Sequence, residues 1–301
     1  MNHKLSAIAS KARIEAALDA RDEAFDWDDA ITLAAFETAP DAPDVWQLDA
    51  YLAAKPTTKQ RKAVAALFGD DPPKLTAEAL PETDWVSESQ RGVEPIRAGR
   101  FFVHTPEHAP SPDAGVTNFC IPAAQAFGTG HHETTAGCLV MLDTMRAQGL
   151  VPRHIADIGT GTGLLAFAAL DLWPRAVVTA SDIDPVCEPA VIDNALRNGV
   201  AIGNGPGQCS MVVADGMDDP HLEAAAPFDL LIANILAGPL IEMAQDFASA
   251  VTPRGNILLS GLLTTQEPQV RAAYRRAGFR LQARLTGGDW SILWLRARFT
   301  G

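Results

Sequence analysis

Apolar positions in the first eighty residues form short runs of strand length and two stretches with helical spacing. The strand candidates are 5–9, 31–36, 45–52 and 75–80, and the helix candidates are 12–20 and 57–68. Short alternating or apolar runs are typical of strands, whereas apolar residues three and four apart indicate a helix. The order of elements is therefore β-α-β-β-α-β, which predicts a small α+β domain over residues 1–80.

The pattern changes twice after residue 80. Residues 81–117 are rich in proline, glycine and serine, which indicates a connector, with Trp85, Phe101 and Phe102 as its docking anchors. Residues 118–301 then alternate short apolar runs with helical stretches. The predicted strands are 155–158, 177–180, 211–213, 228–233 and 256–259, and the main helices are 186–197, 239–250 and 267–277. Nearly continuous apolar strands predict a parallel sheet with helices on both faces.

The last two strands depart from this pattern. Residues 279–284 and 291–297 are separated by a short gap around Gly287-Gly288-Asp289, which leaves no room for a crossover helix. They therefore form an antiparallel hairpin at the end of a mostly parallel seven-stranded sheet. This architecture resembles the Rossmann-like α/β fold of class I methyltransferases, and doubly wound dehydrogenases lack the hairpin. The element order of residues 1–80 is that of a ferredoxin-like domain.

Composition narrows the class of protein. The chain has 301 residues, enough for two domains, and its 47% hydrophobic and 20% charged residues are typical of a soluble globular protein. No apolar run has the length of a membrane span, and residues 1–25 lack the apolar region of a signal peptide. Four scattered cysteines without a C-x-x-C pair indicate reduced thiols, so we expect a cytoplasmic protein.

The net charge of −13 bears on the partners of the protein. A protein that grips a nucleic-acid backbone usually has a basic stripe, and the basic clusters at 59–62 and 271–276 fit solvated helix faces instead. An acidic body is compatible with a basic protein substrate, and equally with solubility alone. We therefore expect no direct nucleic-acid partner and no membrane partner.

A glycine-rich turn carries the main functional signal. Residues Asp157-Ile158-Gly159-Thr160-Gly161-Thr162-Gly163 follow a predicted strand and precede a helical run, an arrangement that brings a ligand against bare backbone. The dinucleotide fingerprint G-x-G-x-x-G requires a glycine where Leu164 stands. The shorter turn suits a nucleoside without phosphates, of which S-adenosyl-L-methionine is the commonest. We predict this cofactor, with Asp157, Gly159 and Gly161 in its site; an ordinary tight turn is the alternative.

Aspartates end the next two strands. Asp182 lies 19 residues after Gly163, the distance at which a strand-end carboxylate accepts hydrogen bonds from ribose hydroxyls. Asp184 precedes Pro185 and is the better candidate for a helix cap. Asp215 stands before a glycine, where a carboxylate either meets the adenine amino group or only forms a turn. The sequence does not distinguish these two roles of Asp215.

Asn234 closes the predicted strand 228–233 and is the candidate catalytic residue. Its amide oxygen accepts and its amide nitrogen donates hydrogen bonds, so it is suited to hold an amine in line with a sulfonium methyl group. Positioning supplies most of the rate gain in a direct displacement, up to ~7–11 kcal/mol. An asparagine before a helix is also a common cap, and the catalytic role of Asn234 depends on the neighbouring motifs.

A loop at 126–135 precedes the next helical run with the sequence AFGTGHHETT. Two consecutive histidines and Glu133 suggest a metal site, but no further ligand is spaced for zinc, so we expect no metal. The loop is instead predicted to cover the cofactor, with Thr129, Gly130 and Thr135 against it.

At these motifs the chain resembles the ribosomal protein L-11 methyltransferase family. The resemblance extends from about Trp85 to the C-terminus, through the segments AFGTGHHETT, DIGTGTGLLAFAAL, SDIDPVCEPAVIDNALRNGV, ANILAGPL and LLSGLL. It implies S-adenosyl-L-methionine-dependent methylation of lysine ε-amines and an N-terminal α-amine on that ribosomal protein of the large subunit. It also implies that the ferredoxin-like domain binds the substrate and that Thr135, Gly159, Asp182 and Asn234 contact the cofactor. We further expect a monomer.

The chain departs from the family in one loop. Where the family usually has G-T-H-P-T-T, residues 130–135 read G-H-H-E-T-T, which removes a rigid proline and adds a carboxylate. This change bears on loop motion and on substrate preference. The similar lysine methyltransferases of the electron-transfer flavoprotein β subunit share much of the catalytic domain but typically lack the full N-terminal domain.

The sequence disfavours three other functions. A nicotinamide-dependent oxidoreductase is disfavoured by Leu164 and by the terminal hairpin. A non-catalytic adaptor has no need for Gly159, Asp182 and Asn234 together. Methylation of nucleic acid predicts a basic or aromatic-rich substrate domain, and residues 1–80 are not basic. A protein-amine methyltransferase is therefore the favoured function.

Overall fold

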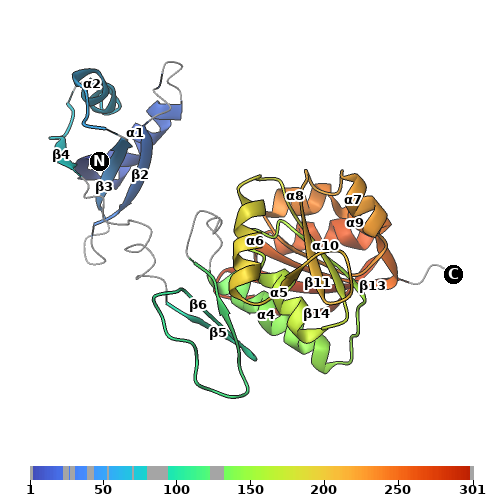
Figure 1. Cartoon of the computed structure of the whole chain (residues 1–301). Coiled ribbons are helices and arrows are strands. Elements are labelled where there is room, and N and C mark those ends of the chain that lie inside the picture. Colours follow the sequence, from blue (N-terminus) through green and yellow to red (C-terminus); the bar gives the residue numbers. More distant parts are fainter. Residues whose placement is uncertain are drawn as a thin grey trace. The chain divides into compact units, whose positions relative to one another are not determined.

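The computed structural model shows two compact units, residues 1–85 and 86–301 (Figure 1). The structure describes residues 3–22, 27, 31–38, 44–52, 54–69, 71–79, 94–122 and 132–298. None of the helices in these ranges is long and apolar enough to cross a membrane.

The first unit has the β-α-β-β-α-β element order that the sequence predicts. Its elements are β1 (His3–Ser10), α1 (Lys11–Asp22), β2 (Thr32–Glu37), β3 (Val45–Leu52), α2 (Thr58–Ala66) and β4 (Thr76–Ala79). The strands pair antiparallel in the order β2-β3-β1-β4. Leu5 and Ala7 of β1 are buried opposite Ala50 and Leu48 of β3, so the apolar positions of both strands share one face. The assignment of this unit as a ferredoxin-like substrate domain stays a prediction.

The second unit contains a mostly parallel sheet. Its strands are β8 (His154–Ile158), β9 (Val177–Asp182), β10 (Ala201–Ile202), β11 (Gln208–Val213), β12 (Phe228–Asn234), β13 (Val251–Leu263), β14 (Phe279–Gly287) and β15 (Trp290–Ala297). The order is β10-β11-β9-β8-β12-β13-β15-β14, with parallel pairs up to β13 and antiparallel pairs at β15 and β14. The seven predicted strands and the terminal hairpin are confirmed. Within the described ranges, the two-residue strand β10 adds an eighth at the edge.

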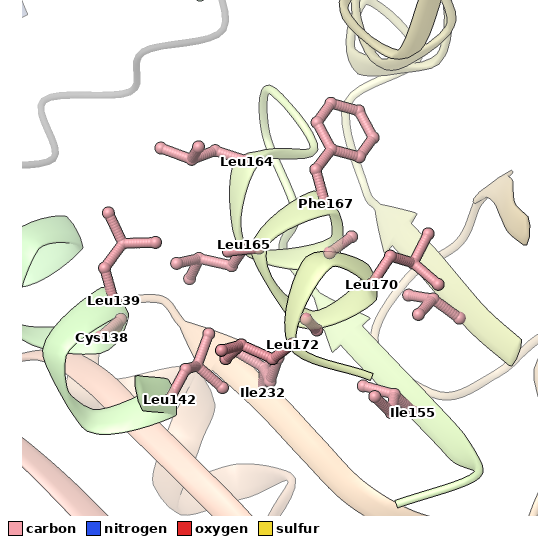
Figure 2. Close-up of a cluster of buried hydrophobic side chains, with 14 of the residues drawn as sticks. Cys138, Leu139, Leu142, Ile155, Leu164, Leu165, Phe167, Leu170, Leu172 and Ile232 are labelled. Carbon is pink, nitrogen blue, oxygen red and sulfur yellow. The ribbon is translucent and has the colours of Figure 1, made fainter. Parts of the chain in front are cut away.

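Helices cover both faces of this sheet (Figure 1). They are α4 (His132–Ala147), α5 (Leu164–Leu172), α6 (Cys187–Arg197), α7 (Pro220–Ala225), α8 (Ala237–Glu242), α9 (Ala244–Ala250) and α10 (Glu267–Arg276). Successive strand residues enter opposite cores: Ile155 packs in one and Ala156 in the other, and Leu230 and Leu231 divide in the same way. Figure 2 shows leucines of α4 and α5 gathered with Ile155 and Ile232 in the first of these cores. The helix predicted over 239–250 is two helices, which meet at Met243.

The described part of the predicted connector, residues 94–117, is built into the second unit. Strands β5 (Ile96–Ala98), β6 (Phe101–His104) and β7 (Thr117–Cys120) form a three-stranded sheet. Phe101 is fully buried and stacks on Phe119 with ring centroids 5.9 Å apart, whereas Phe102 is half-buried. Alternating apolar residues on β6 join the core beside α4 and α5, which explains why this segment is ordered rather than a loose linker. Trp85 lies outside the described residues.

Glu267 holds the terminal hairpin against α10. Its buried carboxylate accepts hydrogen bonds from Ser291 Oγ at 2.7 Å, Arg284 Nε at 2.6 Å and Arg271 at 3.1 Å. Burial raises the pKa of this carboxyl, but the three hydrogen bonds outweigh it and hold the pKa below its ordinary value. The charged form is therefore stabilised at neutral pH, and the start of β15 is fixed in position, with Trp290 next to Ser291.

Candidate active site

A cavity of about 690 Å³ opens at the carboxyl ends of β8, β9, β11 and β12, the edge where open α/β sheets bind ligands. Its wall includes six of the residues that the sequence predicts, namely Thr135, Gly159, Gly161, Asp182, Asp215 and Asn234. Asp157 lies behind this wall. Thr129 and Gly130 fall outside the described residues, as do the side chains of His131 and His132.

The glycine turn presents bare backbone to the cavity. Gly159 and Gly161 have φ values of +70° and +56°, a region that side-chain-bearing residues rarely adopt. A Cβ atom on Gly159 would lie 2.2 Å from Cγ2 of Ile235, so that position also has no space for a side chain. The turn is anchored to the neighbouring strand because Thr160 N donates to Ser181 O at 2.9 Å. The backbone conformation therefore favours glycine at both positions, and the lack of space also requires it at Gly159.

Asp182 connects the glycine turn to the end of β9. Its Oδ2 accepts from the amide of Gly161 at 2.8 Å, and its Oδ1 accepts from the amide of Asp184 at 3.1 Å. Each carboxylate oxygen keeps a second lone pair, and the half-buried side chain lines the cavity. Asp184 Oδ1 accepts from Val186 N at 3.0 Å, which closes a turn just before α6. That helix begins at Cys187 with Val186 as its N-cap residue, so Asp184 is not the cap of α6 as predicted.

Asp157 supports the turn from within the core. Its Oδ2 accepts from Thr160 Oγ1 at 2.6 Å and from Ala166 N at 3.0 Å, and the residue is 1% exposed. Ala166 is the third residue of α5, whose N-cap is a glycine without a side chain, so Asp157 satisfies an amide that a cap would otherwise serve. Burial raises the pKa of this carboxyl to about 7, against the two hydrogen bonds that lower it, and nearby Asp182 adds to the rise.

The elevated pKa of Asp157 predicts a pH-dependent stability. Because the folded chain favours the protonated carboxyl, its contribution to stability is fully present below about pH 4 and is lost as the pH rises through about 7. Asp157→Asn keeps an oxygen acceptor for both donors and does not titrate. We expect the unfolding free energy of the variant, relative to that of the natural protein, to rise by up to about 4 kcal/mol between about pH 4 and about pH 7. Above about pH 7 this difference should stay constant. Urea unfolding at a series of pH values measures the difference, and a pH-independent difference would contradict the assignment.

Asn234 ends β12 at the cavity wall. Among the described residues its carboxamide makes no hydrogen bond, and α8 begins only at Ala237 with Leu236 as its N-cap. The alternative role of Asn234 as a helix cap is therefore excluded. Asn234 pairs in register with Ser260 of β13, which places Gly261 beside Ile235. The amide is thus held on a buried strand with its polar atoms available.

Charge on the cavity wall has one sign. The carboxylates of Asp182, Asp184, Asp215 and Glu242 line it, and no lysine or arginine does within the described ranges. A concave site with carboxylates and no cation favours a positively charged ligand. A sulfonium nucleoside fits this charge, and the bare turn leaves room for the nucleoside.

Several wall residues were not identified as functional from the sequence. Gly261, Met243, Glu242 and Trp290 line the cavity. Gly261 lies in a segment used only for the family resemblance. Trp290 is the first residue of β15 in the terminal hairpin. Gly288 of this hairpin lies close to Glu133 at the start of α4. Only the fold therefore brings this aromatic ring to the site.

Sheet topology and cavity together define a class I methyltransferase. Its cofactor is S-adenosyl-L-methionine. A model of the family described as ribosomal protein L11 methyltransferase (PrmA) matches residues 12–298, and the chain belongs to this family.

Individual relatives agree with this assignment. The ribosomal protein L11 methyltransferase of Rhizobium meliloti is 36% identical over 294 residues, covering 97% of this chain and 98% of the relative. That of Sinorhizobium fredii is 43% identical over 235 residues, 77% and 78% of the two chains. Among solved structures, a ribosomal protein L11 methylase from Lactobacillus delbrueckii subsp. bulgaricus has a TM-score of 0.55 and 25% identity, over 67% of this chain and 95% of that one.

Proposed function

We propose that this protein transfers methyl groups to lysine ε-amino groups and to the N-terminal α-amino group of ribosomal protein L11. The observation that carries the proposal is the cavity at the strand ends, where an available carboxamide stands among carboxylates and no lysine or arginine of the described residues lines the wall. The relatives are ribosomal protein L11 methyltransferases, which supports ribosomal protein L11 as the substrate. The first unit is proposed to bind that protein.

The site residues predicted from the sequence have the following proposed tasks. The glycine turn is proposed to let the nucleoside lie against Gly159 and Gly161, and Asp182 to accept hydrogen bonds from its ribose hydroxyls through lone pairs that the two backbone amides leave unused. Asp215 is exposed at the rim and is proposed to accept from the adenine amino group, with Thr135 of α4 closing the site. Asp157 is proposed to act through the turn, because it lies behind the wall.

When bound, S-adenosyl-L-methionine supplies an activated methyl group on a positively charged sulfur. The chain's own task is to orient an amine and to keep its lone pair free. A lysine with an ordinary pKa of ~10.4 is almost wholly charged at neutral pH, and a confined site beside a sulfonium disfavours a second positive charge. The Asn234 oxygen accepts a hydrogen bond from one N–H of the neutral amine. This hydrogen bond orients the amine so that the lone pair of its nitrogen points toward the methyl group. The proton leaves to water before attack.

The proposed function is tested by label transfer. The purified protein is incubated with S-adenosyl-L-methionine carrying a labelled methyl group and with a mixture of ribosomal proteins, and the labelled band is mapped by mass spectrometry. We expect label on one protein, L11, at lysine side chains and at its N-terminus. Label on a different protein, or on ribosomal RNA included in the same mixture, would overturn the proposed substrate.

Replacing Asp182 should weaken cofactor binding. In Asp182→Asn the amide nitrogen faces one of the two backbone N–H donors that the carboxylate now satisfies, and one charged acceptor is lost. Hydrogen bonds to charged groups contribute ~1.5–3 kcal/mol, so we expect affinity to fall roughly ten- to a hundred-fold. Isothermal titration with S-adenosyl-L-methionine measures the change. Asp184→Asn, at the same wall, is the matched control and should change affinity less than about three-fold; equal losses would argue against a ribose acceptor at Asp182.

A further inference from the structure

Four arginines surround a hollow at the opposite end of the sheet from the cavity. Arg254 lies near the start of β13, whereas Gly261 of the cavity wall is seven residues further along that strand, roughly 20 Å away. The hollow is about 400 Å³ in volume, and its lining consists of Arg254, Arg280, Gln282, Arg296, Ala297 and Arg298. It therefore belongs to the second unit but not to the methyl-transfer site.

Strand register places two of these arginines side by side. Arg280 of β14 and Arg296 of β15 are direct antiparallel partners, so their side chains leave the same face of the sheet about 5 Å apart at Cβ. Further along this face Trp294 and Leu258 are buried, in the core that α4 covers. The hollow thus begins where the apolar cover of the face ends.

Backbone contacts fix the rim of the hollow. Arg296 Nε donates to the carbonyl of Arg254 at 3.1 Å, and Arg254 has the positive φ of +66°, which turns the chain sharply at this point. Arg298 N donates to the carbonyl of Gly278 at 3.0 Å, which secures the end of β15 against the start of β14. Gln282 lies at the irregularity in the β14 register and adds an uncharged amide to the lining.

The charge of the hollow is unlike that of the chain. The whole protein has a net charge of −13, yet no carboxylate of the described residues lines this hollow, and Arg280, Arg296 and Arg298 form no ion pair within the described ranges. Like charges directly opposed across two strands destabilise a sheet, and an anion in the hollow removes that repulsion. A single carboxylate would neutralise only one of the guanidinium groups of Arg280, Arg296 and Arg298. A ligand with several phosphate groups matches the charge better, because each phosphate accepts paired N–H donors from arginine.

We propose that this hollow is a binding site for consecutive phosphate groups, distinct from the methyl-transfer site and independent of its function. The shared chemistry is that of an RNA backbone and of a small polyphosphate. The arginines come from three separate segments, which is why no basic stripe is visible along the sequence. Spatial convergence, rather than sequence clustering, makes the site.

Binding to the full-length protein tests the site with two probes, inorganic pyrophosphate by calorimetry and a fluorescently labelled single-stranded RNA by anisotropy. We expect Arg280→Gln combined with Arg298→Gln to weaken binding at least roughly ten-fold and to lower the slope of log affinity against log salt by about 1.5. Arg275→Gln with Arg276→Gln, two exposed arginines in the last turn of α10, removes the same charge outside the hollow and should change little.

The outcomes separate the two ligand sources. RNA that binds more tightly than pyrophosphate, with a steeper salt dependence, identifies the backbone of RNA as the ligand. Pyrophosphate that binds as well as RNA and displaces it identifies a small polyphosphate. Either result supports the site if binding is weakened in the Arg280 and Arg298 double variant and not in the Arg275 and Arg276 double variant. Absence of binding by both probes, or an equal loss in both double variants, overturns the proposal. Unchanged cofactor affinity shows that the variants remain folded.

Discussion

Asn234→Ala is expected to lower the rate of methyl transfer roughly a hundred-fold or more at saturating cofactor, while cofactor affinity changes only a few-fold. The carboxamide stands at the end of a buried strand, lines the cavity and makes no hydrogen bond among the described residues, so its loss leaves the wall intact but removes the group that orients the amine. Misplacing a reacting group by about 1 Å already costs on the order of a hundred-fold. Single-turnover kinetics with titrated cofactor measure the two quantities separately.

Asn234→Asp tests whether residue 234 acts by accepting or by donating a hydrogen bond, because a carboxylate only accepts. The carboxylate keeps an acceptor for the amine N–H but favours the charged form of the amine, so we expect more residual activity than in Asn234→Ala and a rate that rises at higher pH than in the natural protein. A matching pH profile in all three proteins, or full turnover in Asn234→Ala, would remove Asn234 from the mechanism.

Gly261→Ala is expected to disturb the same site by displacing the segment that follows Asn234. A Cβ atom at this position would lie 2.3 Å from the carbonyl oxygen of Ile235 and 2.7 Å from its carbonyl carbon. These are backbone atoms, so the segment after Asn234 must move, and φ of +82° adds the strain of a left-handed alanine. We expect a loss of about 2–4 kcal/mol in unfolding free energy, together with a fall in turnover of roughly a hundred-fold.

Gly149→Ala is the matched control for this prediction. Gly149 has nearly the same φ, +85°, but a Cβ atom there meets nothing within 4 Å. It should therefore cost only the ~1–2 kcal/mol of the left-handed conformation and leave turnover unchanged. Denaturant unfolding and steady-state rates of both variants decide the matter: equal effects would mean that contact with Ile235 is unimportant to the site.

Much of the candidate site follows from the sequence because parallel strands end at one edge of the sheet. A residue such as Asp182 or Asn234, placed directly after an apolar strand, must point into the region where the other strand ends meet. The glycine turn is likewise local, since its φ values and its position between β8 and α5 depend on consecutive residues. Asp157 shows the limit of this reasoning. It adjoins the turn in the sequence, yet its side chain faces the core. There it accepts hydrogen bonds from Thr160 and Ala166 and does not line the cavity.

By itself the sequence determined the alternation of elements, the parallel sheet with its terminal hairpin and the strand-end chemistry of the site, because periodicity, glycine turns and strand ends are properties of neighbouring residues. Only the tertiary structure decided which distant residues meet: Gly261 against Ile235, Trp290 at the cavity wall, Phe101 in the core of the second unit, and Arg280 opposite Arg296. These contacts depend on strand register and on packing between segments far apart in the chain, and no local pattern encodes either.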